Sequence, residues 1–186
     1  EYCWYNNRVW ADEYYDQALN RAMYSLSTTG EYLSASGKNA EEKRRKLLKA
    51  CCDREQEYLH GNPCRDIVYP DIIRTVKELS ERFPVFIVSN CQSGYIELVC
   101  DKLDIGNYIK DSECYGNTLK GKAENLKALC LRNNLKAPVY VGDTDGDRLS
   151  CEEAGIPFIF AAYGFGDTEK YAASIDKCTE LLTLLD

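Results

Sequence analysis

Three aspartates alternate with small residues in the run 142–147, which reads GDTDGD and follows an apolar stretch at 138–141. Carboxylates this close together repel one another unless a cation or a lysine balances their charge. Oxygen ligands of this kind suit Mg²⁺, which takes one or two protein carboxylates and completes its shell with water and substrate oxygens. Asp143 leaves the apolar stretch directly and is the expected Mg²⁺ ligand. Asp147 follows one helical turn later, where it either supports the metal site without binding the metal directly or simply caps a helix.

Ser89 and Asn90 follow a second apolar stretch, at 85–88, and precede a helix expected to begin near Ser93. A hydroxyl and successive backbone N–H groups at a helix N-terminus suit the binding of a phosphoryl oxygen. An ordinary turn, with Ser93 as the helix cap, explains the same residues. Taken alone, this segment favours the turn. Phosphate binding becomes the better interpretation only where a second phosphate-binding feature accompanies it.

Lys122 is that second feature, because it opens a helix predicted over 122–133. A lysine is poorly placed at the positive end of a helix dipole, so another interaction must hold it there. Neutralising a phosphoryl group and the neighbouring carboxylates is one such interaction. A solvated surface lysine is the alternative, and it describes Lys120 better than Lys122.

The elements that must position these residues alternate between short apolar strands and amphipathic helices. Strands are predicted at 85–88, 138–141 and 158–160, and helices at 70–79, 93–103, 122–133, 147–154 and 175–185. Continuous apolar strands alternating with helices predict a doubly wound, Rossmann-like α/β core, a parallel sheet covered on both faces, over 65–186. Ligands of such sheets bind beyond the carboxyl ends of the strands, where the candidate residues fall.

The first third of the chain has a different pattern, predicted to be a small all-helical cap domain over 1–64. Residues 11–26 have helix-forming composition, and 41–59 carry an amphipathic stripe. A breaker cluster at 60–64, reading HGNPC, marks the boundary with the core.

Composition excludes several classes of function. The net charge is −7 and the sequence pI about 4.9, which argues against nucleic-acid or membrane-surface partners. The ten cysteines form no C-x-x-C pair and the chain has one histidine, so we expect free thiols and a cytoplasmic location. No apolar run is long enough to span a bilayer, and no signal peptide is visible.

Three features of the sequence resemble motifs two, three and four of the haloacid dehalogenase superfamily and occur in the same order. They are a strand followed by Ser89-Asn90, a helix opened by Lys122, and a strand followed by Gly-Asp-Thr-x-x-Asp. The run 161–166, AAYGFG, resembles its phosphoglycolate-phosphatase-like branch. The resemblance implies that Ser89 and Asn90 bind the transferring phosphoryl group, Lys122 stabilises its charge, and Asp143 holds Mg²⁺ with support from Asp147. It also implies that the helical region is a cap closing over a small phosphorylated metabolite.

The sequence departs from the family at its first motif, because no Asp-x-Asp-Gly-Thr run occurs in the 186 residues. Either that motif lies upstream of Glu1, which we favour, or residues 3–9 are its decayed relic, with Trp4 and Asn6 in place of the acids. The family's first strand lies between the strands predicted at 85–88 and 138–141. We therefore expect the central strand to come from residues upstream or from another chain.

The expected function is Mg²⁺-dependent hydrolysis of a small phosphomonoester through an aspartyl-phosphate, with the chain inactive alone. Two rivals remain. One is a degenerate, non-enzymatic binding protein that keeps the pocket without the nucleophile. The other is a phosphoacceptor signalling domain, against which the predicted cap argues.

Overall fold

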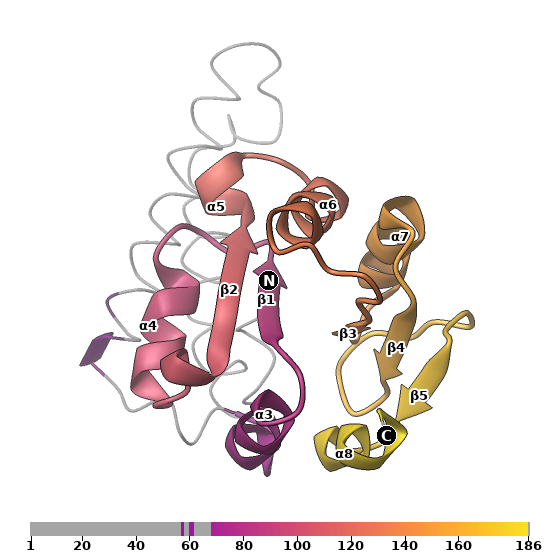
Figure 1. Cartoon of the computed structure of the whole chain (residues 1–186), viewed down its shortest axis with the longest axis horizontal. Coiled ribbons are helices and arrows are strands. Elements are labelled where there is room, and N and C mark those ends of the chain that lie inside the picture. Colours follow the sequence, from indigo (N-terminus) through magenta and orange to yellow (C-terminus); the bar gives the residue numbers. More distant parts are fainter. Residues whose placement is uncertain (1–56, 58–59, 62–67, 186) are drawn as a thin grey trace, which may run out of the picture.

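The computed structural model describes residues 57, 60–61 and 68–185. These form the region predicted as the α/β core, whereas the predicted cap at 1–64 lies outside the described residues apart from 57, 60 and 61. Helices and strands alternate through the core (Figure 1). In chain order they are α3 (Ile72–Ser80), β1 (Val85–Ser89), α4 (Tyr95–Lys102), η2 (Gly106–Tyr108), β2 (Ile109–Cys114), α5 (Tyr115–Thr118), α6 (Lys122–Arg132), β3 (Tyr140–Gly142), α7 (Asp145–Ala154), β4 (Phe158–Ala161), β5 (Ala173–Ile175), η3 (Cys178–Glu180) and α8 (Leu181–Leu184).

The five described strands form two separate parallel sheets. β1 pairs with β2 in one, and β3, β4 and β5 follow one another in the other. Among the described residues, β1 and β3 each have a hydrogen-bonded strand on one side only. The predicted parallel α/β architecture is confirmed, and the further strand expected between these two strands stays a prediction.

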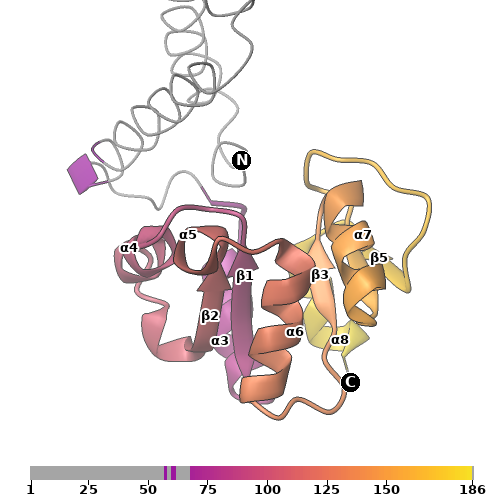
Figure 2. The same ribbon diagram turned by 90° about the horizontal axis from the view of Figure 1, so that it is seen from above.

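The sheets share two hydrophobic cores, one on each face. Phe158 and Phe160 of β4 point to the face covered by α6 and α7, in a core that also takes Val88 of β1 and Tyr140 of β3. The intervening Ile159 and the other alternate strand residues pack on the opposite face against α3 and α8. Figure 2 shows α6 lying between the β1–β2 pair and α7, and α6 contacts β1, β2 and α7.

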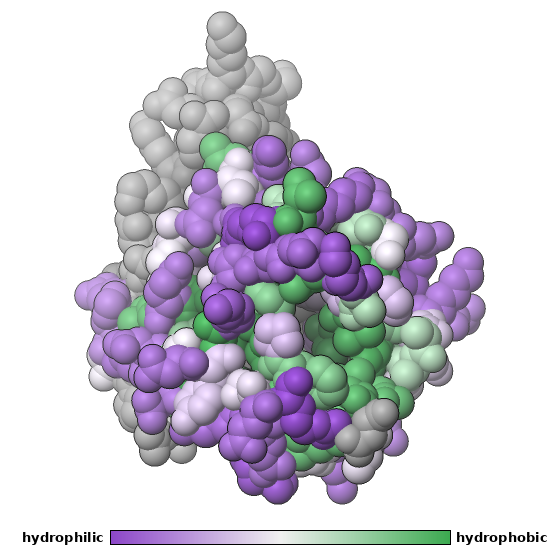
Figure 3. Space-filling view, in the orientation of Figure 1, coloured by the Kyte–Doolittle hydropathy of each residue, from purple (hydrophilic) through white to green (hydrophobic). Residues whose placement is uncertain are grey.

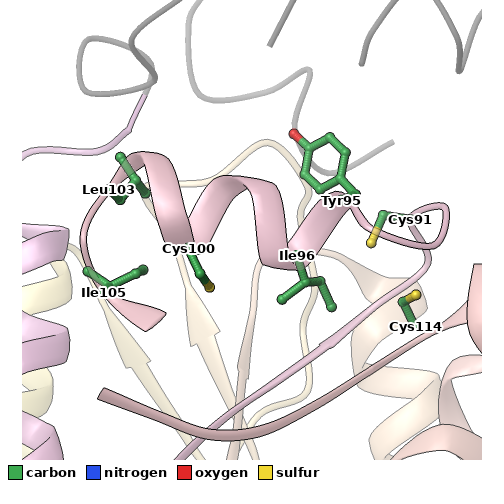
Figure 4. Close-up of a cluster of buried hydrophobic side chains, with 7 residues drawn as sticks. All are labelled: Cys91, Tyr95, Ile96, Cys100, Leu103, Ile105 and Cys114. Atoms are coloured by element: carbon green, nitrogen blue, oxygen red, sulfur yellow. The ribbon is translucent and has the colours of Figure 1, made fainter. Parts of the chain in front are cut away.

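A third core lies between α4 and the β1–β2 sheet. Tyr95, Ile96 and Cys100 of α4 bury against Leu103, Ile105, Cys91 and Cys114 (Figure 4). The helices thus cover both faces, as a doubly wound sheet requires.

Several predicted elements need correction. No element was predicted over 109–114, which forms β2 with Asp111 and Glu113 paired to Arg132 of α6. The helix predicted over 175–185 is wrong, since the chain there ends β5 and continues as η3 and the short α8. Helix α7 begins at Asp145, two residues earlier than predicted, because Thr144 caps it.

The six described cysteines are free, as expected for those positions: Cys91, Cys100, Cys114, Cys130, Cys151 and Cys178. Burial raises the pKa of the Cys100 thiol to about 11 and that of Cys151 to about 12, so both are held as inert thiols. In the described part of the chain, no helix combines the length and the apolar character needed to cross a membrane.

Arg132 fastens α6 to β2, and its removal gives a pH-dependent loss of stability. Its guanidinium donates to both oxygens of Asp111, at 2.7 and 2.9 Å, and to Glu113 at 2.5 Å. Hydrogen bonding from Arg132 is the largest cause lowering the pKa of Asp111 to about 2. A carboxyl whose pKa is lowered by folding stabilises the fold above its unfolded pKa, and this contribution fades as the pH falls from about 4 to 2.

We expect Arg132→Gln to lower the free energy of unfolding by about 1–2 kcal/mol at pH 7, a figure reduced for screening because Arg132 is 40% exposed. Urea unfolding at a series of pH values measures this difference, which should shrink below pH 4. Lys127→Gln breaks an exposed pair with Glu153 at 3.5 Å and serves as the control, with little change at any pH. A difference that stays constant down to the acid limit would contradict this account.

Candidate active site

A buried ion pair between Lys122 and Asp147 forms the centre of the candidate site. Lys122 is the first residue of α6 and Asp147 lies in the first turn of α7, and their side chains are 3% and 1% exposed. The ammonium donates a short hydrogen bond to Asp147 Oδ1. The structure therefore excludes the solvated-lysine alternative for Lys122, because a charge this deeply buried must be paired.

Asp147 also caps its own helix, which confirms the capping interpretation, whereas its support of a metal site stays a prediction. Its Oδ2 accepts from the Thr144 hydroxyl at 3.0 Å and from the Thr144 N–H at 3.3 Å, while its own N–H donates to Thr144 Oγ1 at 3.2 Å. Gly142, at the end of β3, leaves room for this carboxylate: a Cβ there would lie 2.8 Å from it. The carboxylate is thus fixed from two helices and a strand end.

Asp143 lies between β3 and α7, half-buried beside the segment 163–166. One of its carboxylate oxygens accepts from the Phe165 N–H at 3.1 Å, and its backbone carbonyl accepts from the Gly166 N–H at 3.1 Å. Burial is the first cause that raises the pKa of the Asp143 carboxyl, and the charge of Asp147 adds to it. The charged form of a half-buried carboxylate beside a second negative charge is stabilised by a nearby cation.

The three aspartates of the run have three different environments. Asp145 is exposed and bonds to Arg148, which lowers the pKa of its carboxyl. Asp147 is neutralised by Lys122. Among these three aspartates, Asp143 is the one whose carboxyl has a raised pKa, and it stays the candidate metal ligand.

Tyr69 is a site residue that the sequence did not indicate. Burial and the charge of Asp143 raise the pKa of its hydroxyl to about 12. Its ring packs edge-on against Tyr163 at 4.8 Å, and among the described residues its buried hydroxyl oxygen has no hydrogen-bond partner. Tyr69 precedes the predicted 70–79 helix without any periodic or motif signal, so only the fold could bring it beside Asp143.

Ser89 is the last residue of β1, one residue beyond the predicted strand, and Asn90 follows it. The Ser89 hydroxyl accepts from the Cys91 N–H at 3.2 Å, which opens the loop towards α4, and Asn90 is exposed. The cap of α4 is Gly94 rather than Ser93, so the turn alternative loses its capping residue. The link from β1 to the rest of the site runs through Tyr140, whose hydroxyl donates to the Val88 carbonyl at 3.0 Å and whose ring lies 5.7 Å from Lys122 Nζ.

The described residues are compatible with a Mg²⁺ site at Asp143. In the described ranges no group of three or more His, Cys, Asp or Glu side chains could hold a metal ion. Mg²⁺ needs only one or two carboxylates with water and substrate oxygens. Asp143 is such a carboxylate, and Gly164 and Gly166 let the facing backbone approach it closely.

Fold and site together define a doubly wound parallel α/β core with acids and a lysine gathered near the ends of its strands. The sequence profile described as haloacid dehalogenase-like hydrolase matches residues 7–161. The chain therefore belongs to the haloacid dehalogenase-like hydrolases, as the resemblance of its motifs implied. A search of curated proteins found no match.

Solved structures with this fold are distant in sequence. A predicted phosphoglycolate phosphatase from Haemophilus somnus is 14% identical with a TM-score of 0.66, over 91% of this chain and 76% of that one. A subfamily IA hydrolase from Geobacter sulfurreducens is 21% identical with a TM-score of 0.58, over 64% of this chain, which spans only 57% of that one. The hydrolase YfnB of Bacillus subtilis, solved bound to magnesium, is 18% identical with a TM-score of 0.56, over 89% and 81%.

Proposed function

We propose that this chain is the core of a Mg²⁺-dependent phosphohydrolase acting on small phosphorylated metabolites. The observation that carries the proposal is the buried Lys122–Asp147 pair beside Asp143, a half-buried carboxyl whose pKa is raised. A buried lysine at a helix N-terminus and a carboxylate in need of a cation form a site for a multiply charged anion and its metal. Phosphoryl transfer needs this charge stabilisation more than any other contribution from the protein.

Each residue has a distinct part in the proposed reaction. Asp143 would hold Mg²⁺, which when bound supplies Lewis-acid polarisation of the phosphoryl oxygens. Lys122 would neutralise charge on the transferring group, while Asp147 fixes the position of Lys122. The Ser89 hydroxyl and the N–H groups after β1, with Asn90, would bind the remaining phosphoryl oxygens.

The nucleophile in this proposal is an aspartate that forms an aspartyl-phosphate and is supplied by polypeptide preceding Glu1. No Asp-x-Asp-Gly-Thr run occurs in residues 1–186, and we expect those residues alone to give no turnover. The same absence favours the second candidate, a non-enzymatic protein that binds Mg²⁺ and phosphate without hydrolysis. We also propose a cytoplasmic location, which the free thiols support.

Calorimetric titration with Mg²⁺ tests the metal assignment. We expect Asp143→Asn to weaken binding by more than about 100-fold, and Asp147→Asn to weaken it less, by about 10–100-fold, the typical cost of losing a supporting group. Asp145→Asn is the matched control, since it removes the same charge two residues away from an exposed position, and it should bind as the wild type does. Because the pKa of Asp143 is raised, affinity should fall as the pH is lowered through that pKa. Equal affinity in wild type and Asp143→Asn would exclude Asp143 as the ligand.

A further inference from the structure

Two cysteines lie where the paired strands β1 and β2 end. Ser89, the last residue of β1, is the register partner of Cys114, the last residue of β2. The two segments stay side by side beyond the strands, because the Gly116 N–H donates to the Cys91 carbonyl at 3.0 Å. Cys91 and Cys114 therefore lie on neighbouring backbone segments although they are far apart in the chain.

The side chains of both cysteines point into the same core beneath α4. Cys91 is 9% exposed and Cys114 is 1% exposed. Both belong to the cluster that α4 covers (Figure 4). The Cys114 thiol donates to the Gln92 carbonyl at 3.7 Å, so its sulfur lies beside the residue that follows Cys91. Burial is the largest cause that raises the pKa of the Cys91 thiol, and Cys114 adds to it by its charge and by a hydrogen bond between the two thiols.

A disulfide needs little more than this arrangement. It joins Cα atoms that are usually about 4.4–6.8 Å apart, a range that includes the spacing of about 4.8 Å between hydrogen-bonded strands. Two sulfurs in contact are farther apart than two bonded sulfurs, so bond formation must pull the segments together. Cys100 lies in the same core but differs from this pair, because burial and Glu97 raise the pKa of its thiol without a contribution from another cysteine.

The loop after Ser89 is the segment that such a bond would move. An added Cβ at Gly116 would lie 2.0 Å from the Ser93 nitrogen and 2.5 Å from the Gln92 carbonyl carbon, so this loop rests directly on the backbone after β2. The Cys91 N–H also donates to the Ser89 hydroxyl at 3.2 Å. A pull on Cys91 is therefore passed on to the Ser89 hydroxyl.

We propose that Cys91 and Cys114 form a reversible disulfide that displaces residues 89–93 and thereby weakens the binding of phosphoryl groups at Ser89 and Asn90. The displacement follows from the thiol pair alone, whereas its effect on phosphoryl binding rests on the proposed function. The pair is a redox-sensitive modification site next to the candidate active site.

A small-molecule disulfide is the oxidant in this reaction. The thiolate of Cys91, the more exposed of the pair, attacks one sulfur of the oxidant, whose S–S bond breaks as a mixed disulfide forms. The half that leaves takes up a proton. The deprotonated sulfur of Cys114 then attacks the Cys91 sulfur, and the second half leaves in the same way. Two protein thiols are thus oxidised while one small-molecule disulfide is reduced to two thiols.

The surroundings of the pair decide how fast it responds. Figure 3 shows that the described surface on the α4 side is mostly hydrophilic, so a polar oxidant meets a polar surface there. Because the pKa of the Cys91 thiol is raised, its thiolate is scarce at neutral pH and the exchange is slow. The pair therefore responds to lasting oxidation and not to brief pulses.

Oxidised glutathione tests the proposal in the protein expressed from its natural start codon. After incubation the remaining thiols are blocked, and a peptide map under non-reducing conditions should show Cys91 linked to Cys114, with release by dithiothreitol. Hydrogen exchange should then be at least about 10-fold faster at the Cys91 and Gly116 amides, whose hydrogen bonds hold the loop. Calorimetric affinity for inorganic phosphate should fall by at least about 10-fold, since a displacement of about 1 Å can cost about 100-fold.

Two cysteine variants separate this pair from general oxidation. Cys114→Ala should stop at the mixed disulfide on Cys91, which mass spectrometry identifies by the added glutathione. Cys100→Ala removes another buried thiol of the same core and should respond as the wild type does. If Cys114→Ala does not fold, the peptide map of the wild type decides.

A Cys91 that stays unlinked, or that pairs with a different cysteine, would overturn the proposal. So would a linked protein whose Cys91 and Gly116 amides exchange as before, or one that binds phosphate as tightly as the reduced protein. If the reduced protein itself binds no phosphate, the proposed function fails, and the peptide map and the exchange rates still decide whether the disulfide forms and moves the loop.

Discussion

Replacing Lys122 with methionine should destabilise the protein by about 3–5 kcal/mol, because Asp147 is then left as an uncompensated charge in the interior. The two side chains are 3% and 1% exposed, so water cannot replace the lost partner. Urea unfolding at pH 7 measures this loss. In the protein with hydrolytic activity, the same substitution should also reduce turnover by at least about 10²–10³, the usual cost of one electrostatic stabiliser.

The double variant Lys122→Met/Asp147→Asn separates the two effects. A neutral asparagine can keep its bond to Thr144, so most of the lost stability should return. Turnover should not return, since the positive charge is still missing. If Lys122→Met alone lowers the free energy of unfolding by less than about 1 kcal/mol, the ion pair is solvated and its description as buried is wrong.

Gly164→Ala should have the second large effect. An added Cβ at this position would lie 2.1 Å from Asp143 Cβ, so either Asp143 or the 163–166 segment must move. We expect a loss of about 1–3 kcal/mol from overpacking. We also expect Mg²⁺ affinity to fall by about 10–100-fold, because the Phe165 N–H no longer orients the carboxylate.

Gly146→Ala is the control for this prediction. Gly146 is exposed in the first turn of α7, and its nearest neighbour to an added Cβ is Thr144 Oγ1 at 3.6 Å. Alanine there should leave Mg²⁺ binding unchanged and should not destabilise the helix. If both alanine variants bind Mg²⁺ equally well, the close approach at Gly164 has no role in placing Asp143.

The sequence predicted the parts of this fold that rest on local patterns. Strands β1 and β4 are short continuous apolar runs, and α6 follows its predicted range from Lys122 almost to its end. β2 could not be predicted, because Asp111 and Glu113 look like loop residues until Arg132, about 20 positions later, pairs with them. The prediction of a C-terminal helix was wrong because the apolar spacing over 175–185 fits both a helix and the observed strand end followed by two short turns of helix.

The candidate site, too, could be predicted from the sequence only in part. Lys122 and Asp147 were each suggested by position along one element, but their buried contact joins two helices and had to be seen in the fold. Tyr69 lies beside Asp143 only because α3 and the 163–166 segment come together. Long-range packing of this kind leaves no periodic trace in a single sequence.

The proposed phosphohydrolase function is tested most directly by the hydrolysis of p-nitrophenyl phosphate by the protein expressed from its natural start codon, with Mg²⁺ and with a chelator. We predict turnover that requires Mg²⁺, is lost on chelation, and is lost in Asp143→Asn but retained in Asp145→Asn. Absence of turnover in a protein that still binds Mg²⁺ and phosphate would contradict this account in favour of the non-enzymatic binding protein. Turnover that survives both chelation and Asp143→Asn would contradict the proposed mechanism.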